Sequence, residues 1–519
     1  MMTTGKKKEK GRKVSRVEKI AKNYSGEIIY QIVVTCCSFV GRTVFVKMLG
    51  AEYLGINGLY TNVLSILSLA DLGIGSSIVF SLYKPLREND QGKIYALMKL
   101  YKIVYRWIGV VVTVLGFILM PFLPYMMNGG TDIVNIYVVY VIYLLQSSMS
   151  YLFWAYHTSI IQADQKSYVI SLIYSLATII TTICQIIILF LTANFILYLI
   201  VALIVNVLKN LMIGCTSYKM YPFLKEKRND RLNREEVRTI FKNSGALMIY
   251  RVNTAIMNSC DSLVLSTFIG LRIVGLYSNY VMFNKCFSSF IDKIFSSMKA
   301  SIGDLHAEGE RNKEYQIFLS CNYMGAIIYG TASVGVAVIA NDVLQVWLGS
   351  SYIISDLLPV LIGISMYLAG IQHVNSIFRD AAGLFQQAKF RPLFATIINV
   401  SLSVLLVKNY GIHGVIAATI CSQCATYLWF DPLILCKYAF GVKPKQYFLR
   451  NAEYFLILAV VGIVTWQVKI RLAIPLLFRI CVEILTCVVG IIGLFVSIWY
   501  RKPEVEYLKN TVMKRLQRR

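Results

Sequence analysis

Several charged residues of this 519-residue chain lie inside long hydrophobic stretches, where an ionised side chain is costly and by default marks a function. Four of them are candidates for a cavity site: Arg42, Arg251 and Lys285 are basic, and Asp261 is acidic. A basic excess favours an anionic ligand, because guanidinium and ammonium groups bind phosphate oxygens through charge-assisted hydrogen bonds. We therefore predict that Arg42, Arg251 and Lys285 bind a phosphate or diphosphate in a polar cavity. Asp261 would be their charge partner or an ion-coupling residue.

These residues also have simpler interpretations. The long side chain of Arg42 could reach the outer membrane interface, and Lys285 could form a structural pair with Asp261. Lys209 is expected to extend to the inner interface. Arg479 and Glu483 are four residues apart, so we predict that they pair with each other on one helix face.

Two further aspartates and a histidine are candidates for ion coupling. Asp71 and Asp292 lie near the inner half of their hydrophobic stretches, 221 positions apart, and His373 lies within another stretch. Carboxylates and imidazoles in such places can carry a coupling ion or a proton. A structural hydrogen bond for the aspartates and a satisfied core position for His373 are equally consistent with the sequence.

Motifs for enzymatic chemistry or nucleotide use are absent from the sequence. It contains no G-x-x-x-x-G-K-[ST] phosphate loop and no HExxH zinc signature. Cys421 and Cys424 have CxxC spacing, but they lie in a hydrophobic stretch without a second ligand pair. We therefore expect no enzyme activity, no cofactor and no metal. Without a nucleotide site, any movement of a ligand would have to be driven by an ion gradient, the membrane potential or consumption of the ligand.

The composition indicates which elements hold these residues. The chain is 57% hydrophobic and only 15% charged, whereas soluble domains carry about 25% charged residues. We predict an all-α integral membrane protein with about fourteen transmembrane helices. Their expected ranges are 27–46, 54–82, 103–124, 133–157, 169–191, 195–217, 244–267, 273–298, 317–340, 352–378, 393–407, 413–436, 453–468 and 476–499.

The distribution of basic residues predicts the orientation of these helices. If the N-terminus is cytoplasmic, the inside segments hold 42 of the 52 Lys and Arg residues and the outside turns hold five. Basic residues concentrate on the cytoplasmic side of membrane proteins, so we expect both termini inside. The net charge of +25 then faces an anionic inner leaflet, which excludes nucleic acid as the main partner.

An internal repeat organises the chain. MLGAEYLGINGLY (48–60) is partly repeated in FIGLRIVGLYSNY (268–280), and eleven identities occur without a gap across 47–95 at an offset of 220 residues. The chain would then contain two parallel six-helix repeats related by an axis along the membrane normal, with a site between them, as in alternating-access transporters. We expect a basic cytoplasmic tail, an N-lobe, a basic linker, a C-lobe, two additional helices and a basic tail, over 1–24, 25–217, 218–243, 244–437, 438–500 and 501–519.

The stretches KMLGAEYLGINGLY, LADLGIGSSI, MNSCDSLVLSTFIGLRIVGLYSNY and NYGIHGVIAATI, with the short QADQK loop (162–166), resemble one family. It comprises the Wzx-type polysaccharide and lipid-linked-oligosaccharide flippases of the multidrug/oligosaccharidyl-lipid/polysaccharide (MOP) exporter superfamily. The resemblance implies two lobes arranged as a V and flipping of an undecaprenyl-diphosphate-linked oligosaccharide in the bacterial cytoplasmic membrane, for cell-surface polysaccharide biosynthesis. It also implies that Arg42 and Arg251 occupy places comparable to those of cavity residues, and that the last two helices form a groove for the lipid tail.

The expected partners are a polyprenyl-diphosphate-linked glycan, membrane lipids and proteins of polysaccharide polymerisation or assembly, and the repeat is compatible with a monomer. Two other functions stay open. A MATE-like cation-coupled drug or metabolite antiporter would have a more acidic cavity. A non-transporting scaffold of a polysaccharide assembly complex would tolerate replacement of Arg42 and Arg251.

Overall fold

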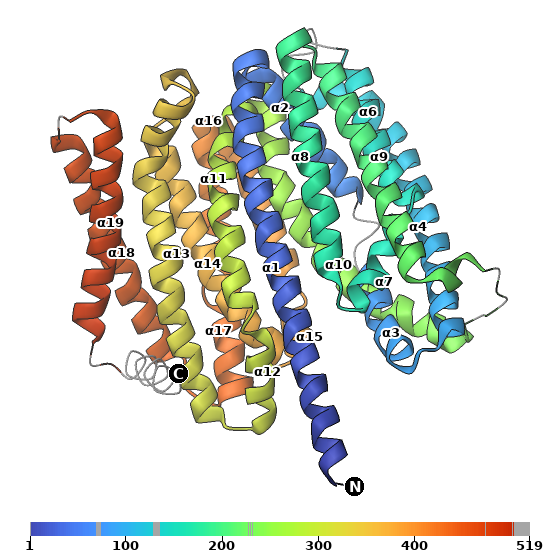
Figure 1. Cartoon of the computed structure of the whole chain (residues 1–519). Helices are drawn as coiled ribbons and strands as arrows, with labels where there is room; N and C mark the ends of the chain where they lie inside the picture. Colours follow the sequence, from blue (N-terminus) through green and yellow to red (C-terminus); the bar gives the residue numbers. More distant parts are fainter. Residues whose placement is uncertain are drawn as a thin grey trace. The chain divides into compact units, whose positions relative to one another are not determined.

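The computed structural model describes residues 2–68, 74–127, 135–226, 228, 230, 232–472, 474–500 and 502. Within these residues it describes all side chains except those of 2–21, 243, 245–247, 249–251, 254, 258, 300 and 385. This part of the chain is helical and contains no strand, as the sequence predicts. Figure 1 shows the helices, coloured along the sequence.

The helices of the first half are α1 (Met2–Leu49), α2 (Ala51–Leu67), α3 (Ile74–Glu88), α4 (Gln91–Leu119), α5 (Leu123–Met126), α6 (Ile136–Leu152), α7 (Thr158–Ala163), α8 (Ser167–Thr192), α9 (Phe195–Met220) and α10 (Arg234–Phe268). Those of the second half are α11 (Leu271–Ser296), α12 (Lys299–Glu308), α13 (Arg311–Trp347), α14 (Leu357–Ala381), α15 (Phe385–Ala388), α16 (Arg391–Thr426), α17 (Phe430–Ile434), α18 (Lys445–Arg471) and α19 (Leu476–Trp499). Short turns η2 (Met120–Phe122), η3 (Ala155–His157), η4 (Pro222–Lys225), η5 (Ser350–Tyr352) and η6 (Leu435–Phe440) connect some of them.

Within the described residues, nine helical segments are long and apolar enough to cross a membrane. A tenth is added if Ile136–Leu152 and Ala155–Ala163, which are bent by 48° at a short break, form one span. The helices α10 and α11 carry several of the predicted site residues and are not among the nine, because their polar residues lower their hydropathy. The protein is therefore a multi-pass membrane protein, and its helix content is roughly consistent with fourteen spans.

Packing divides the chain into unit 1 (residues 1–272) and unit 2 (273–519). In unit 1, α1 packs against α8, and α10 packs against α2 and α3. In unit 2, α13 packs against α14, α18 and α19, and α14 also packs against α16 (Figure 1). The sequence repeat begins its second copy at 244, within α10, whereas packing assigns α10 to unit 1.

The repeat is visible in the backbone. Gly50 and Gly270 both have positive φ angles, 90° and 126°, which explains why glycine recurs there. Asn89 and Gly309, again 220 positions apart, have φ angles of 54° and 75° and precede α4 and α13. The same turn geometry therefore serves both copies.

The repeated tyrosines make equivalent contacts. Tyr60 and Tyr280 are both fully buried. The hydroxyl of Tyr60 donates to the carbonyl oxygen of Ile136 at 2.8 Å, at the start of α6. That of Tyr280 donates to Asn341 Oδ1 at 2.7 Å and accepts from the Ile354 amide at 3.4 Å, just before α14. Each tyrosine ties the second helix of its copy to the chain that enters the fourth.

An aromatic cluster forms the core at one end of unit 2. The ring of Phe318 on α13 lies 5.1 Å from Phe378 on α14, 5.0 Å from Phe440 in η6 and 5.5 Å from Tyr447 on α18. All four side chains are buried. This core fixes the helix ends that carry the charged residues described next.

Candidate functional site

The residues predicted from sequence fall on both units. In unit 1, Arg42 on α1 and Asp261 on α10 are half-buried. Arg251 also lies on α10, but its side chain is outside the described residues, as is the whole of Asp71. Arg42 follows Gly41, where an added Cβ would lie 3.6 Å from Thr182 on α8, so this part of α1 packs closely on α8.

In unit 2, the three predicted residues lie on α11 and α14. Lys285 is exposed, whereas Asp292 and His373 are half-buried. Asp292 Oδ1 accepts a hydrogen bond of 2.5 Å from the hydroxyl of Tyr329 on α13, and His373 Nε2 lies 3.2 Å from Ser296 Oγ on α11. The cavity that joins residues of both units stays a prediction.

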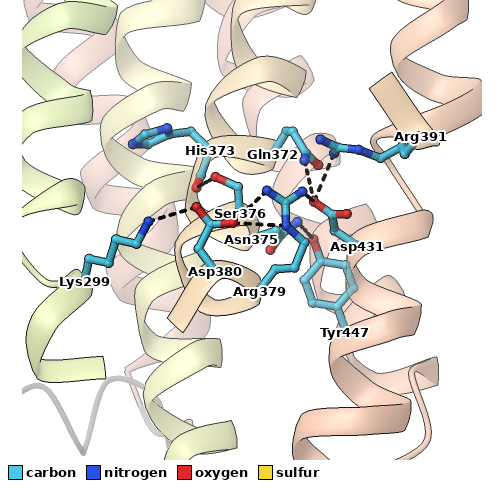
Figure 2. Close-up of polar contacts among 10 residues, drawn as sticks. All are labelled: Lys299, Gln372, His373, Asn375, Ser376, Arg379, Asp380, Arg391, Asp431 and Tyr447. Carbon is cyan, nitrogen blue, oxygen red and sulfur yellow. Dashed lines mark hydrogen bonds and ion pairs between the residues drawn. The ribbon is translucent and has the colours of Figure 1, made fainter. Parts of the chain in front are cut away.

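A buried ion cluster in unit 2 surrounds Asp431 of α17, and Figure 2 shows its side chains. Asp431 is fully buried, and Arg379 and Arg391 are 3% and 5% exposed. Asp431 Oδ2 accepts from Gln372 Nε2 at 2.6 Å, from Arg379 Nη1 at 2.9 Å and from Arg391 Nη1 at 3.0 Å. Burying an ionised group is tolerable only with such partners, because the low local dielectric penalises an unpaired charge.

The cluster continues to the surface through Asp380. This carboxylate accepts from Arg379 Nη2 at 2.9 Å and from Lys299 Nζ on α12 at 2.9 Å (Figure 2). Three basic and two acidic residues therefore alternate from the half-exposed Lys299 to the buried Arg391, which also stacks on the ring of Tyr427 at 4.7 Å. We call Lys299, Gln372, Arg379, Asp380, Arg391 and Asp431 the Asp431 cluster.

The Asp431 cluster connects α12, α14, α16 and α17. The aspartates already accept hydrogen bonds from the guanidinium groups, so the arrangement holds helices together rather than presenting a free anion site. The sequence analysis did not select Arg379 or Arg391 as site residues, and the structure shows that both side chains are buried. Asp431 lies within the predicted span 413–436, so the reasoning that selected Asp261 also applied to it and could have found this cluster.

A second ion cluster attaches the two additional helices to unit 2. Asp342 on α13 accepts from Lys469 on α18 at 3.0 Å and from Arg479 on α19 at 3.0 Å. Arg479 Nε also lies 3.7 Å from Glu483 Oε1, which confirms the predicted pairing of these two residues. The sequence analysis did not predict the contact of Lys469 with the buried Asp342.

Two adjoining cavities open beside α14 and α18. The larger, of about 420 Å³, lies among α14, α16 and α18, and the smaller, of about 330 Å³, lies among α13, α14 and α18. Ile364, Tyr367 and Phe455 line both. Their walls are mainly aliphatic and aromatic side chains, a lining that suits hydrocarbon chains.

Unit 1 carries polar contacts of its own. His157, 2% exposed, lies at the bend between α6 and α7, and its Nδ1 is 2.9 Å from Ser217 Oγ on α9. Lys93 on α4 pairs with Glu236 at the start of α10. Within the described part of the chain, His, Cys, Asp and Glu side chains form no group of three that would hold a metal ion.

Comparison with known protein families identifies the family of the chain. The profile of a family described as polysaccharide biosynthesis protein matches residues 20–298, more than half of the chain. The chain belongs to this family. Comparison of the chain with curated protein sequences finds no significant match.

Several solved structures share the fold of the chain. The lipid II flippase MurJ in an inward closed conformation is 14% identical, with a TM-score of 0.66 over 92% of this chain and 98% of MurJ. An inward-facing multidrug resistance MATE transporter of the MOP superfamily is 14% identical, with a TM-score of 0.63 over 78% of this chain and 98% of its own. A MOP superfamily transporter from Pyrococcus furiosus, also 14% identical, has a TM-score of 0.55 over 78% of this chain and 96% of its own. The fold is therefore of the MOP type, as the sequence predicts.

Proposed function

We propose that this protein is a flippase that moves an anionic undecaprenyl-diphosphate-linked oligosaccharide from the inner to the outer leaflet by alternating access. The observation that carries the proposal is membership of a polysaccharide biosynthesis family combined with a MOP fold. A transporter fold in a polysaccharide pathway needs a cargo that crosses the membrane. In polysaccharide biosynthesis a lipid-linked repeat unit is such a cargo, and the Wzx-type flippases transport it.

Two features of the chain favour a lipid-linked cargo over a small drug. The match to the lipid II flippase extends over 92% of this chain, whereas the MATE transporter cited above covers 78%. The cavities beside α18 are lined mainly by apolar side chains, as a polyprenyl tail requires. Both features favour a flippase over a cation-coupled antiporter.

In this proposal Arg42, Arg251 and Lys285 bind the diphosphate in a central cavity. Asp261, Asp71, Asp292 and His373 serve as charge partners or ion-coupling residues. Because the cell interior is negative, outward movement of an anion is favourable by ~2.3 kcal/mol per charge per 100 mV. The membrane potential would thus assist flipping. The protein would work in the bacterial cytoplasmic membrane, without enzyme activity, alongside polysaccharide polymerase and assembly proteins.

Native mass spectrometry of the protein in nanodiscs tests the proposal. A polyprenyl-diphosphate disaccharide, the matching monophosphate and a cationic dye are titrated against wild type and the Arg42→Ala/Arg251→Ala double variant. The matched control is Lys47→Ala/Arg272→Ala, which removes two exposed basic side chains at the ends of α1 and α11. We expect selective binding of the diphosphate that falls at least tenfold in the first variant and is kept in the control.

Other outcomes identify the alternatives. Dye binding without preference for the diphosphate would contradict the flippase proposal and favour a drug antiporter. Diphosphate binding that is equal in all three proteins would refute the assignment of Arg42 and Arg251. Polysaccharide production that survives the double variant in cells would favour the scaffold.

A further inference from the structure

Lys209 is a basic residue in the middle of the apolar helix α9, fourteen residues after its start and eleven before its end. Its ammonium group lies over the ring of Tyr174 on α8, 5.0 Å from the ring centroid. Within the described part of the chain, Lys209 forms no ion pair within 4.0 Å. The face of a tyrosine ring stabilises a cation but leaves its N–H donors available, so the charge of Lys209 can still bind an anion.

A second tyrosine extends the aromatic surface beside Lys209. Tyr30 on α1 lies 5.9 Å from Tyr174, measured between the ring centroids. The helix α8 packs against both α1 and α9, which brings the three residues together within unit 1 (Figure 1). All three side chains are half-buried, so each keeps accessible surface. We call Tyr30, Tyr174 and Lys209 the Lys209 site.

The two faces of α8 show which way the Lys209 site is turned. One face is exposed and carries large aliphatic side chains, namely Leu172, Leu176, Ile179, Ile183 and Ile187. The opposite face carries an aromatic, two hydroxyl and one amide side chain, all half-buried, namely Tyr174, Thr178, Thr181 and Gln185. An apolar exposed face of a membrane helix contacts lipid. The polar face therefore points away from the lipid and still has surface for a ligand.

The Lys209 site is separate from the position proposed for the diphosphate. Arg42 lies twelve residues beyond Tyr30 on α1, which corresponds to about 18 Å along the helix axis. The oxygens of one diphosphate lie much closer together than that. A diphosphate bound by Arg42 would therefore leave Lys209 for an anionic group elsewhere on the cargo.

The residue types of the Lys209 site narrow the chemistry of that group. Aromatic rings offer flat apolar surfaces, and the C–H face of a sugar ring can pack against such a surface. A lysine ammonium acts as a point charge, whereas phosphate groups are bound best by the planar fork of arginine. One ammonium beside two tyrosine rings thus suits a sugar ring that carries a carboxylate.

We propose that Tyr30, Tyr174 and Lys209 bind an acidic sugar of the repeat unit. The Lys209 ammonium donates hydrogen bonds to the sugar carboxylate, and the sugar ring packs against the tyrosine rings. Lys209 would then make the protein selective for a repeat unit that contains a uronic acid. This inference rests on the proposed function, since it assigns a chemical class to the sugar part of the same cargo.

The test is native mass spectrometry of the full-length protein in nanodiscs with four probes. Two are polyprenyl-diphosphate disaccharides that differ only in the terminal sugar, glucuronic acid or glucose. The other two are polyprenyl disaccharides with the same sugars and no diphosphate. We expect wild type to bind each acidic probe about tenfold more tightly than its neutral counterpart, as for one hydrogen bond between charged groups.

Lys209→Gln removes the charge at similar side-chain length and should reduce this preference to less than about twofold, whereas Lys209→Arg should keep it. Lys219→Gln is the matched control, because Lys219 is an exposed basic residue in the last turn of the same helix. The Tm of each variant shows whether the fold is kept. A preference that is absent from wild type, or that survives Lys209→Gln, overturns the proposal. Equal loss in Lys219→Gln would indicate a general charge effect and overturns it as well.

Tyr174→Leu tests the aromatic surface. It should weaken binding of acidic and neutral probes alike by about fivefold, because both sugars pack on the ring. Phe190→Leu is its control, since Phe190 lies on the lipid-exposed side of α8 and is 65% exposed. Binding by Tyr174→Leu that equals wild type would contradict the proposed packing of the sugar.

The probes without diphosphate separate this inference from the proposed function. Arg42→Ala/Arg251→Ala should lose the preference for diphosphate and keep the preference for the acidic sugar. Lys209→Gln should show the opposite pattern. Failure of diphosphate binding therefore refutes the proposed function without removing the test of the Lys209 site.

Discussion

One carboxylate oxygen of Asp431 accepts hydrogen bonds from two buried guanidinium groups and balances their charge. We therefore expect replacement of Asp431 to lower the stability of the protein strongly. Asp431→Asn keeps the shape but leaves Arg391 without a counter-charge in the interior and Arg379 with Asp380 alone. Removing one partner of a buried ion pair costs about 3–5 kcal/mol. We expect a loss of this size in the free energy of unfolding, measured by SDS titration in mixed micelles.

The matched control for Asp431 is Glu88→Gln. Glu88 pairs with Lys84 at 4.0 Å, but both side chains are more than half exposed, so the expected change is within about 0.5 kcal/mol. Arg391→Gln combined with Asp431→Asn should cost less than the sum of the two single changes, because the variants share one interaction. Equal costs for Asp431→Asn and Glu88→Gln would show that the Asp431 cluster contributes no more than a surface pair.

The carboxyl group of Glu236, at the start of α10, should make the stability of the protein depend on pH. The hydrogen bond from Lys93 lowers the pKa of this carboxyl below its ordinary value of 4.5. A lowered pKa in the folded state stabilises the protein above the unfolded pKa, and this contribution is lost as pH falls through the folded value. We expect Tm of wild type to exceed that of Glu236→Gln by a constant amount from pH 7 to about pH 5.5. The difference should shrink below about pH 4.5.

The contact requires no cavity or ligand, so this prediction tests the Lys93–Glu236 pair of unit 1 alone. A difference in Tm that persists unchanged to pH 3 would mean that the glutamine variant acts through the helix cap. Glu236 also caps α10, because its Oε2 accepts from the Asn233 amide at 3.2 Å. Glutamine can replace that cap but not the charge.

Sequence spacing predicted residue contacts where partners are local. Arg479 and Glu483 are four residues apart on one helix, and their pairing follows from helix geometry alone. Asp431 meets Gln372, Arg379 and Arg391 over separations of 59, 52 and 40 residues, which no local pattern encodes. A charged residue in an apolar stretch indicates that a partner exists, but not which one.

At the scale of elements, close helix packing depends on small residues at particular places. A Cβ added at Gly363 on α14 would lie 2.6 Å from the backbone oxygen of Ser333 on α13, and a backbone atom cannot move aside as a flexible side chain can. We expect Gly363→Ala to cost about 1–3 kcal/mol in the free energy of unfolding, measured by SDS titration, because α13 and α14 must separate.

Gly335 on α13 supplies the control for Gly363. An added Cβ there meets nothing within 4 Å, and alanine favours a helix over glycine by up to about 1 kcal/mol. Gly335→Ala should therefore be neutral or stabilising. A loss of stability as large as that of Gly363→Ala would mean that glycine matters here for flexibility rather than for space.

The positions of the helices could be predicted from hydrophobicity, but the breaks within them could not. The predicted span 133–157 ends early, because the backbone bends at Trp154, whose φ of 49° is disfavoured for a bulky residue. Its ring packs on Gly214 of α9, where an added Cβ would lie 2.8 Å away. Packing between distant segments imposes this bend, so no turn signal in the sequence marks it. Gly411, in contrast, lies between the predicted spans 393–407 and 413–436 and does break α16.

At the scale of the whole molecule, the fold class was predictable because composition and the repeat are properties of the entire chain. Apolar stretches of membrane length can form only helices when they do not alternate, and an offset of 220 residues defines two copies. The packing units were less predictable. The second sequence copy begins within α10, but α10 packs against α2 and α3, which belong to the first copy. The boundary between the packing units therefore differs from the boundary between the sequence copies.

The orientation of the whole chain is the remaining global prediction, and it depends on the 42 basic residues of the segments predicted inside against five outside. Ser351→Cys places a thiol in the predicted outside turn between α13 and α14, and Asp304→Cys places one in α12 on the predicted inside. In intact cells a membrane-impermeant maleimide should label Ser351→Cys above the wild-type background and leave Asp304→Cys unlabelled until the membrane is permeabilised. The native cysteines set that background, and wild type measures it. The reverse pattern would place both termini outside.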